Sequence, residues 1–391
     1  MKIEQTYIGG WFQRTTLHLS EIYDFIQGEE SPLGFDNNKL AKLRQALFIK
    51  EAHLEQGDLE HIVYITAEGL VIDIFEDGLI VLHKKHGGVL ADDIEELKGY
   101  YESKLSPALS YIFSLGAPIP KELANIKTIY PYFVVLKDAV ERDIQKLLEE
   151  FKQHKHTEIK EKTFEMYRGD KLYVINDKGV TLDTVERFVQ EQIFIREFKG
   201  QLHRYLNLHR IIWERIAEVK ERGKIGGKEV GPFYAKIESY AKTINLIDAR
   251  ISQMGTYIHT RESIAKNDPH MKKMIGVLQY RYETLADTLS YIKDIWGMTK
   301  NYVDSALSVF SSIQAQSTEA SVENLTVITS VGVGATLIGL FSESAPDFTI
   351  FGVAYFFILV AIGYMANKIM RYIAQRRKYE IEDVELAKDI E

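Results

Sequence analysis

Short apolar runs separated by turn residues occupy the first part of the chain. Residues 61–66, 71–75 and 79–82 each predict a strand, and Gly69 and Gly78 lie in the turns between them. Two later runs have the same character, at 132–136 and 171–176. Helical patterns occur between the strands, at 92–105 and 139–153. Because strands interleave with helices, we expect residues 1–180 to form an α/β domain.

From about residue 182 the apolar residues recur every three or four positions, which is typical of a helix with one buried face. One such stripe consists of Leu202, Tyr205, His209, Ile212, Ile216 and Val219. Four glycines and a proline interrupt the pattern at 222–232. A second stripe follows, made of Ile237, Tyr240, Ile244, Ile247, Ile251, Met254 and Ile258. The two stripes predict an antiparallel helical hairpin over residues 181–266.

A third helical pattern begins at Asp268-Pro269, an N-cap residue followed by a proline at the first helical position. The next proline is Pro346, and only Gly276 and Gly297 weaken the helix between them, by about 1 kcal/mol each. Its apolar stripe comprises Leu278, Tyr282, Leu285, Leu289, Ile292, Trp296, Thr299, Val303, Ala306, Phe310 and Ile313. We therefore expect one unbroken helix.

Two uncharged segments lie near the C-terminus, at 324–342 and 348–367. Each has about 18 to 20 residues, roughly 30 Å as a helix, which matches the hydrocarbon core of a bilayer. We therefore expect a stalk helix over 267–323 to continue into a membrane span at 324–341, with a second span at 348–370. The alternative is a buried helical hairpin in a protein that folds in water.

The charges beside these segments predict their orientation. The loop 342–347 has no lysine or arginine, whereas five basic residues follow the second segment: Lys368, Arg371, Arg376, Arg377 and Lys378. Positive residues stay on the cytoplasmic side. The predicted fold class is therefore an α+β membrane protein with a cytoplasmic α/β domain, a helical hairpin, a stalk helix and two C-terminal transmembrane helices. We expect it to be a multi-pass protein of the cell membrane with cytoplasmic N- and C-termini.

The first predicted span is unusually rich in small and hydroxylated residues, namely Thr326, Thr329, Ser330, Gly332, Gly334, Thr336 and Gly339. One interpretation is that the span lines a watery axis in a ring of copies of the chain. The other is close helix packing, with Ser330 and Gly334 as the small residues in contact. A helix as long as the predicted stalk cannot bury its stripe alone, so we expect a homo-oligomer in either case.

Composition excludes several functions. The chain has 391 residues and a net charge of −8, which gives no reason to expect a nucleic-acid partner. It has no cysteine, so disulfides, thiolate metal sites and cysteine nucleophiles are absent. The N-terminus lacks the apolar core of a signal peptide. The sequence contains no glycine-rich phosphate loop, no HExxH helix and no nucleophile elbow, and we therefore expect no enzyme.

This order of parts resembles the CorA superfamily of divalent cation transporters, which includes CorA and ZntB. The likeness is closest over 302–329, where Leu325-Thr326-Val327-Ile328 is similar to the start of the family's pore helix. The resemblance implies a homopentameric channel in a lipid bilayer that passes a divalent cation passively. Magnesium is the first expectation, with Zn²⁺, Co²⁺ or Ni²⁺ also possible as the transported or regulatory ion.

One departure from the family concerns the outer end of the first span. The family has Gly-Met-Asn there, whereas an ungapped alignment puts Glu343-Ser344-Ala345 at that position. This departure favours an alternative, a membrane-anchored scaffold or cation sensor without transport activity.

The resemblance and the helical spacing together give the candidate pore residues. The predicted pore lining is Leu325, Thr329, Val333, Thr336 and Leu340. The hydroxyls of Thr329 and Thr336 would face a magnesium ion that keeps its waters. The cytoplasmic mouth would hold Glu319 and Val322, and an outer acidic loop would hold Glu343 and Asp347. The carboxylates have ordinary alternatives: Asp347 is also a suitable N-cap, and Glu319 and Glu343 are also typical solvated residues.

Other candidate ligands have weaker patterns. In the family, carboxylates between subunits bind cation, and Glu283, Asp287 and Asp294 on the stalk are the candidates for that role or else solvated helix charges. Two histidine pairs are typical of solvated loops rather than of a zinc site, namely His83 with His86 and His154 with His156.

Overall fold

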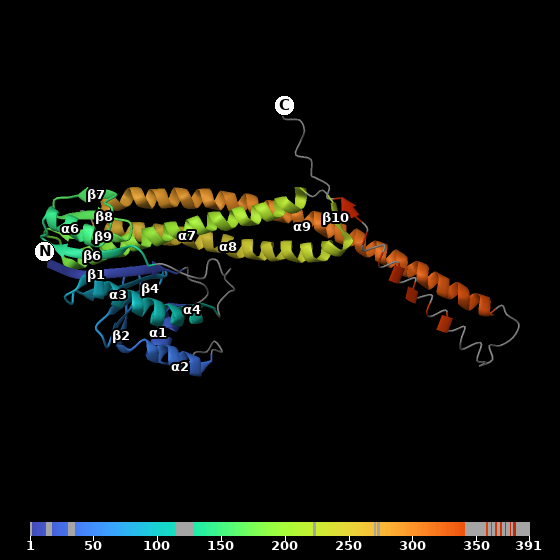
Figure 1. The fold of residues 1–391 in the computed structure, drawn as a ribbon, viewed down its shortest axis with the longest axis horizontal. Coiled ribbons are helices and arrows are strands. Elements are labelled where there is room, and N and C mark those ends of the chain that lie inside the picture. The colour runs from blue at the N-terminus through green and yellow to red at the C-terminus, as the bar shows by residue number, and fades with distance from the viewer. Residues whose placement is uncertain are drawn as a thin grey trace, which may run out of the picture. The chain divides into compact units, whose positions relative to one another are not determined.

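The computed structural model (Figure 1) describes residues 2–12, 18–29, 36–114, 129–221, 224–269, 271 and 274–340, with scattered positions between 357 and 380. Its internal contacts divide the chain into two units. The first unit comprises Met1–Leu206 and Ala249–Lys293, and the second comprises Asn207–Asp248 and Asp294–Glu391. Three long helices contribute residues to both units.

The first unit contains a nine-stranded mixed sheet with the strand order β2-β3-β4-β5-β1-β6-β9-β8-β7. Its strands are β1 (Lys2–Trp11), β2 (Ile49–Glu55), β3 (His61–Thr66), β4 (Val71–Phe75), β5 (Leu79–Lys85), β6 (Tyr132–Lys137), β7 (Thr157–Lys160), β8 (Phe164–Arg168) and β9 (Leu172–Asp177). Neighbouring strands are antiparallel except β6 and β9, which are parallel.

The five strands predicted from the sequence are confirmed as β3, β4, β5, β6 and β9. The predicted turn glycines Gly69 and Gly78 have φ angles of 84° and 92°, a conformation that glycine adopts without strain. The strand prediction omits β2, β7 and β8, and it also omits β1, which lies near the centre of the sheet. Its Gly9-Gly10 pair lowers the strand propensity that the remaining residues have.

One face of the sheet packs against the short helices, and Figure 1 shows α1, α2, α3 and α4 on the side of β1 away from the long helices. These helices are α1 (Leu19–Gln27), α2 (Asn37–Ala46), α3 (Leu90–Tyr100), the π-helical turn η1 (Tyr101–Leu105), α4 (Ser106–Ser114) and α6 (Glu141–Glu150). The core between them includes Ile8, Ile72 and Leu82, each fully buried. Alternate strand residues point to the opposite face.

The opposite face packs against helix α7 (Leu182–Glu221). The rings of Trp11 and Phe198 have their centroids 5.1 Å apart. A Cβ atom at Gly9 would lie 3.0 Å from Cγ2 of Ile193 and 2.6 Å from the carbonyl oxygen of Ile80. Glycine at position 9 therefore allows α7 to approach the sheet closely.

The predicted helical stripes are confirmed in α7, α8 (Gly227–Asn267) and α9 (Ile275–Leu340). Residues buried in α9 include Leu278, Tyr282, Leu285, Leu289, Ile292, Trp296, Thr299, Val303, Phe310 and Ile313. The predicted break at 222–232 is shorter than expected. Strand β10 (Lys224–Gly226) pairs there with β11 (Lys378–Glu380), and α8 already begins at Gly227 with Pro232 near its start.

The membrane part of the predicted fold class is wrong for the residues that the structure describes. None of their helices is long and apolar enough to cross a bilayer. Helix α9 is continuous to Leu340, but most of its side chains beyond residue 316 lie outside the described residues. The second predicted span, 348–370, lies for the most part outside the described residues.

Three predictions are corrected by this finding: the two transmembrane helices, the multi-pass location in the cell membrane with cytoplasmic termini, and the assignment as a membrane channel. The fold that the structure describes is an α/β arrangement with a large mixed sheet and three long helices.

Candidate metal centre

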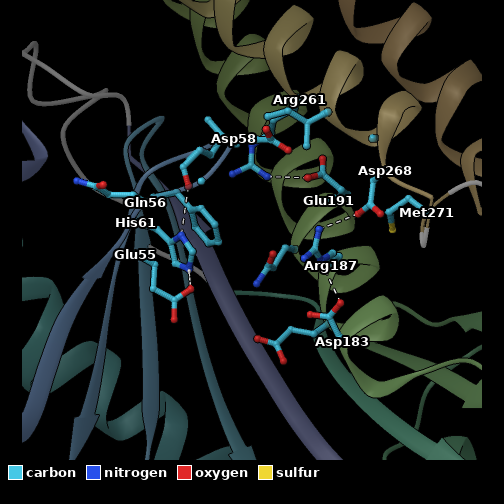
Figure 2. Close-up of a pocket in the computed structure, with 17 residues that line it drawn as sticks. Glu55, Gln56, Asp58, His61, Asp183, Arg187, Glu191, Arg261, Asp268 and Met271 are labelled. Atoms are coloured by element: carbon cyan, nitrogen blue, oxygen red, sulfur yellow. Dashed lines mark hydrogen bonds and ion pairs between the residues drawn. The ribbon is translucent and has the colours of Figure 1, made fainter.

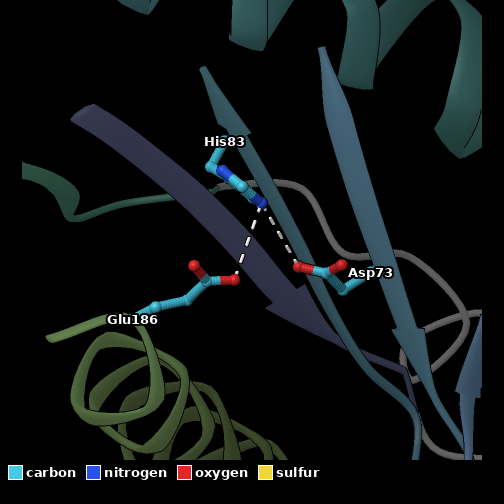
Figure 3. Close-up of side chains that lie close together, drawn as sticks. All are labelled: Asp73, His83 and Glu186. Carbon is cyan, nitrogen blue, oxygen red and sulfur yellow. Dashed lines mark ion pairs between the residues drawn. The ribbon is translucent and has the colours of Figure 1, made fainter. Parts of the chain in front are cut away.

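Three metal-ligating side chains converge between the sheet and α7, and Figure 3 shows them pointing toward one another. They are Asp73 of β4, His83 of β5 and Glu186 of α7, and one ligand atom from each lies within 4.8 Å of the other two. Nε2 of His83 is 3.7 Å from Oδ2 of Asp73 and 3.7 Å from Oε1 of Glu186. All three residues belong to the first unit.

Strand register places the first two ligands on one face of the sheet. Val71 of β4 pairs with His83 of β5, so Asp73, two residues further along β4, is the diagonal neighbour of His83. On the other side of β5, Tyr7 of β1 is paired with His83, and their rings stack with centroids 5.1 Å apart. This stacking fixes the orientation of the imidazole.

The beginning of α7 places the third ligand. The hydroxyl of Thr181 accepts a hydrogen bond from the backbone N–H of Thr184 at 3.3 Å, which is the geometry of an N-cap. Glu186 lies in the second turn after this cap. Its side chain is 27% exposed, against 5% for Asp73 and 9% for His83, so a cation from solution would meet Glu186 first.

Neither separation to the imidazole is a hydrogen bond, since 3.7 Å is too long. Oδ2 of Asp73 and Nδ1 of His83 are buried and have no hydrogen-bond partner. Among the described residues, no lysine or arginine lies within ion-pair distance of either carboxylate. The two carboxylates and the imidazole therefore lie close together without a hydrogen bond between them. A bound cation would stabilise this arrangement.

The pKa values have a consistent physical cause. Burial, followed by repulsion from Glu186, raises the pKa of Asp73 well above its usual value. Burial, followed by the charge of Asp183, raises the pKa of Glu186. Burial, with a smaller effect of Lys85, lowers the pKa of His83 to about 4. The imidazole is therefore neutral at pH 7, the form that binds metals.

The lowered pKa of His83 predicts an acid sensitivity of the metal-free protein. A group whose pKa is lower when folded stabilises the fold above its unfolded pKa, here 6.5, and this stabilisation is lost as pH falls toward about 4. We expect a loss of about 3 kcal/mol between pH 7 and pH 4. Urea unfolding in EDTA measures this effect. Between pH 7 and pH 4, the free energy of unfolding should fall by about 3 kcal/mol less in His83→Gln than in the parent. His156 is exposed, so His156→Gln should behave like the parent. Equal acid sensitivity in the parent and His83→Gln would contradict the assignment.

A pocket of about 500 Å³ adjoins the metal centre and shares Glu186 with it. Figure 2 shows the pocket between the β2–β3 loop, which carries Asp58, and helices α7 and α8. Carboxylates outnumber the two arginines, Arg187 and Arg261, among its lining residues: Glu55, Asp58, Asp183, Glu186, Glu191 and Asp268. An excess of negative charge in a recess raises the local concentration of cations.

The arginines of the pocket are already paired. Nη1 of Arg187 donates to Oδ2 of Asp268 at 2.8 Å, and Nη1 of Arg261 donates to Oε1 of Glu191 at 2.8 Å. These pairs hold the beginning of α7 against the end of α8. Glu186 takes no part in them, and it therefore remains available to a cation.

The stalk carboxylates predicted as regulatory ligands lie on exposed positions of α9. Oε1 of Glu283 accepts a hydrogen bond from Gln279 at 3.1 Å, and Asp287 and Asp294 are exposed. Among the described residues, the one cluster of three metal-ligating groups is the metal centre, and it includes none of them.

The predicted pore residues fall at the end of α9. Thr329 is exposed, and the side chains of the others lie outside the described residues: Glu319, Val322, Leu325, Val333, Thr336 and Leu340. Glu343 and Asp347 also lie outside the described residues.

The histidines differ from their predicted loop environment in one instance. His83 is buried in β5, whereas His86 contacts Asp93 at 2.7 Å and His156 pairs with Asp170 at the surface. Sequence reasoning missed Asp73 and Glu186 altogether. The available signal was a single carboxylate inside the apolar strand pattern at 71–75, since a buried charge needs a partner.

No protein-family model matches the chain, and no curated protein matches its sequence. The resemblance to the CorA superfamily therefore stays a prediction.

Proposed function

We propose that this protein binds one divalent cation at Asp73, His83 and Glu186 and acts as a divalent-cation sensor. The observation that supports the proposal is the convergence of three ligand atoms within 4.8 Å of one another, among them Oδ2 of Asp73, which is buried without a hydrogen-bond partner. Ligand atoms about a tetrahedral zinc ion are roughly 3.3 Å apart, given bonds of about 2.0 Å. The two separations of 3.7 Å to Nε2 of His83 therefore require a small contraction on binding, and the two carboxylate oxygens start within 4.8 Å of each other.

The ligand set favours a transition metal over magnesium. Imidazole suits Zn²⁺, Co²⁺ and Ni²⁺, whereas magnesium prefers oxygen ligands and retains its waters. Of the cations expected from the sequence, the proposal therefore selects Zn²⁺, Co²⁺ or Ni²⁺. Three protein ligands leave at least one coordination position for water, on the side where Glu186 opens to the pocket.

Binding would change how α7 is held. The ion would join β4 and β5 to the second turn of α7, where at present neither carboxylate makes a hydrogen bond to His83. Helix α7 has 40 residues, so it is the element through which occupancy could be transmitted beyond the sheet. A sensor requires such an element, whose position depends on the ligand.

A calorimetric titration of the full chain, after removal of metal with EDTA, tests the proposal. We expect one Zn²⁺, Co²⁺ or Ni²⁺ per chain, bound at least about 100-fold more tightly than Mg²⁺. His83→Gln should weaken binding by about 100-fold, since it removes one of three ligands, while the exposed His156→Gln should leave it unchanged. Identical isotherms for the two variants, or no binding by the parent, would refute the proposal.

The transport activity and the homo-oligomer that the resemblance implies are tested neither by the fold nor by the comparisons. They stay predictions, as does the expectation that the chain is not an enzyme. The proposed metal centre depends on none of them.

A further inference from the structure

Two arginines on different elements converge on one glutamine, in a cluster that shares no residue with the metal centre. Nη2 of Arg168 donates to Oε1 of Gln192 at 3.4 Å, and Nη1 of Arg281 donates to the same oxygen at 3.0 Å. Arg168 ends β8, Gln192 lies on α7 and Arg281 lies on α9, all within the first unit.

The local sequence explains why these groups meet. Alternate residues of β8 face α7, as the contact of Phe164 with Phe188 shows at 5.3 Å between ring centroids. Arg168 has the same strand parity as Phe164 and therefore points toward α7 as well. Its guanidinium also lies 5.9 Å from the ring of Tyr173, on the neighbouring strand β9.

The cluster has positive charge without a matching anion. Among the described residues, neither Arg168 nor Arg281 lies within ion-pair distance of a carboxylate. Arg261 illustrates the usual arrangement in this chain, with Asp77 and Glu191 both paired to one buried guanidinium. Gln192 is neutral, so its oxygen accepts hydrogen bonds but cancels no charge.

Donors in the cluster remain unused. Nε of Arg168 and Nε2 of Gln192 are buried and have no hydrogen-bond partner, and only 1% of Gln192 is exposed. Arg168 and Arg281 are themselves half-buried. Two guanidinium groups and an amide N–H form a donor set suited to a tetrahedral oxyanion.

We propose that Arg168, Gln192 and Arg281 form a binding site for a phosphate group, either free or carried by a small phosphorylated ligand. The charge of two arginines matches a phosphate of charge −1.5 to −2, whereas a carboxylate would leave one positive charge uncompensated. This site is independent of the proposed metal centre.

Equilibrium dialysis of the full chain with radiolabelled inorganic phosphate tests the site, in EDTA and at constant ionic strength so that bound metal contributes nothing. We expect saturable binding of one phosphate per chain, competition by methyl phosphate and no competition by acetate at the same concentration. Competition by methyl phosphate distinguishes a site open to phosphorylated ligands from one restricted to free phosphate. Competition by acetate equal to that by phosphate would overturn the proposal.

Variants locate the binding. Arg168→Met and Arg281→Met should each weaken phosphate binding about ten- to hundredfold, because each removes charge-assisted hydrogen bonds. Arg210→Met is the charge-matched control, since Arg210 is an exposed arginine of α7 paired with Glu214, and it should bind like the parent. Equal affinity in all three variants would overturn the site.

A fourth variant, Gln192→Glu, tests the site even if an arginine variant fails to fold. Gln192→Glu is nearly isosteric and places a carboxylate between the two arginines, so it supplies internally the anion that phosphate would supply. We expect this variant to fold and to lose phosphate binding at up to ten times the dissociation constant of the parent. Binding by Gln192→Glu as strong as that of the parent would exclude the cluster as the site.

Discussion

Replacing Arg261 with methionine is expected to lower the free energy of unfolding by about 3–5 kcal/mol. Arg261 is 1% exposed, and it pairs with Asp77 in the β4–β5 turn and with Glu191 of α7. The hydroxyl of Tyr282, on α9, donates to the same glutamate. Removing the guanidinium would leave two carboxylates buried without a cation, which costs far more than the lost contacts alone.

Urea unfolding monitored by circular dichroism measures this loss, with Arg210→Met as the matched exposed control. The control should change stability by no more than about 0.5 kcal/mol. The triple variant Arg261→Met, Asp77→Asn, Glu191→Gln also neutralises the two carboxylates that the single variant leaves unpaired. It should recover more than half of the lost free energy of unfolding. A loss under about 1 kcal/mol in the single variant would show that the buried network does not hold the helices on the sheet.

The second large effect is a reversal of stability order at the metal centre. In the metal-free protein at pH 7.5, Asp73→Asn should raise the free energy of unfolding by about 1–2 kcal/mol, because it removes a buried carboxylate without a hydrogen-bond partner on Oδ2. At a zinc concentration 100 times the dissociation constant, the parent should gain about 2.7 kcal/mol and the variant nothing. Asp73→Asn is then more stable than the parent without zinc and no longer so with it.

Thermal or urea unfolding with EDTA and with Zn²⁺ gives the four values needed. Asp58→Asn, at an exposed position of the neighbouring pocket, should respond to zinc as the parent does. A variant Asp73→Asn that is less stable than the parent in EDTA would assign Asp73 a structural role. Equal zinc stabilisation in parent and variant would remove Asp73 from the ligand set.

Local periodicity predicts the three long helices and five strands of the sheet, for identifiable reasons. Strands β3, β4 and β5 have apolar runs bounded by Gly69 and Gly78, and these features depend only on residues close in sequence. The stripe of α9 likewise specifies a helix from its own spacing. Strand β1 is not predicted from local sequence, because it forms by pairing with β5 and β6, which are far away in sequence.

Local apolar character misled the interpretation of the C-terminal segment. An uncharged run near Thr326 predicts a span by length, yet no helix among the described residues meets the requirement for crossing a bilayer.

The sequence by itself determined the strands with alternating patterns, the three long helices and the exclusion of cysteine chemistry, because each of these is a property of neighbouring residues or of composition. Only the tertiary structure decided the candidate sites. Asp73 and His83 meet because of the register of two strands, and Glu186 joins them because α7 can approach over Gly9. A ligand set of this kind is specified by distances between residues a hundred positions apart, and those distances exist only once the sheet and the helix have packed.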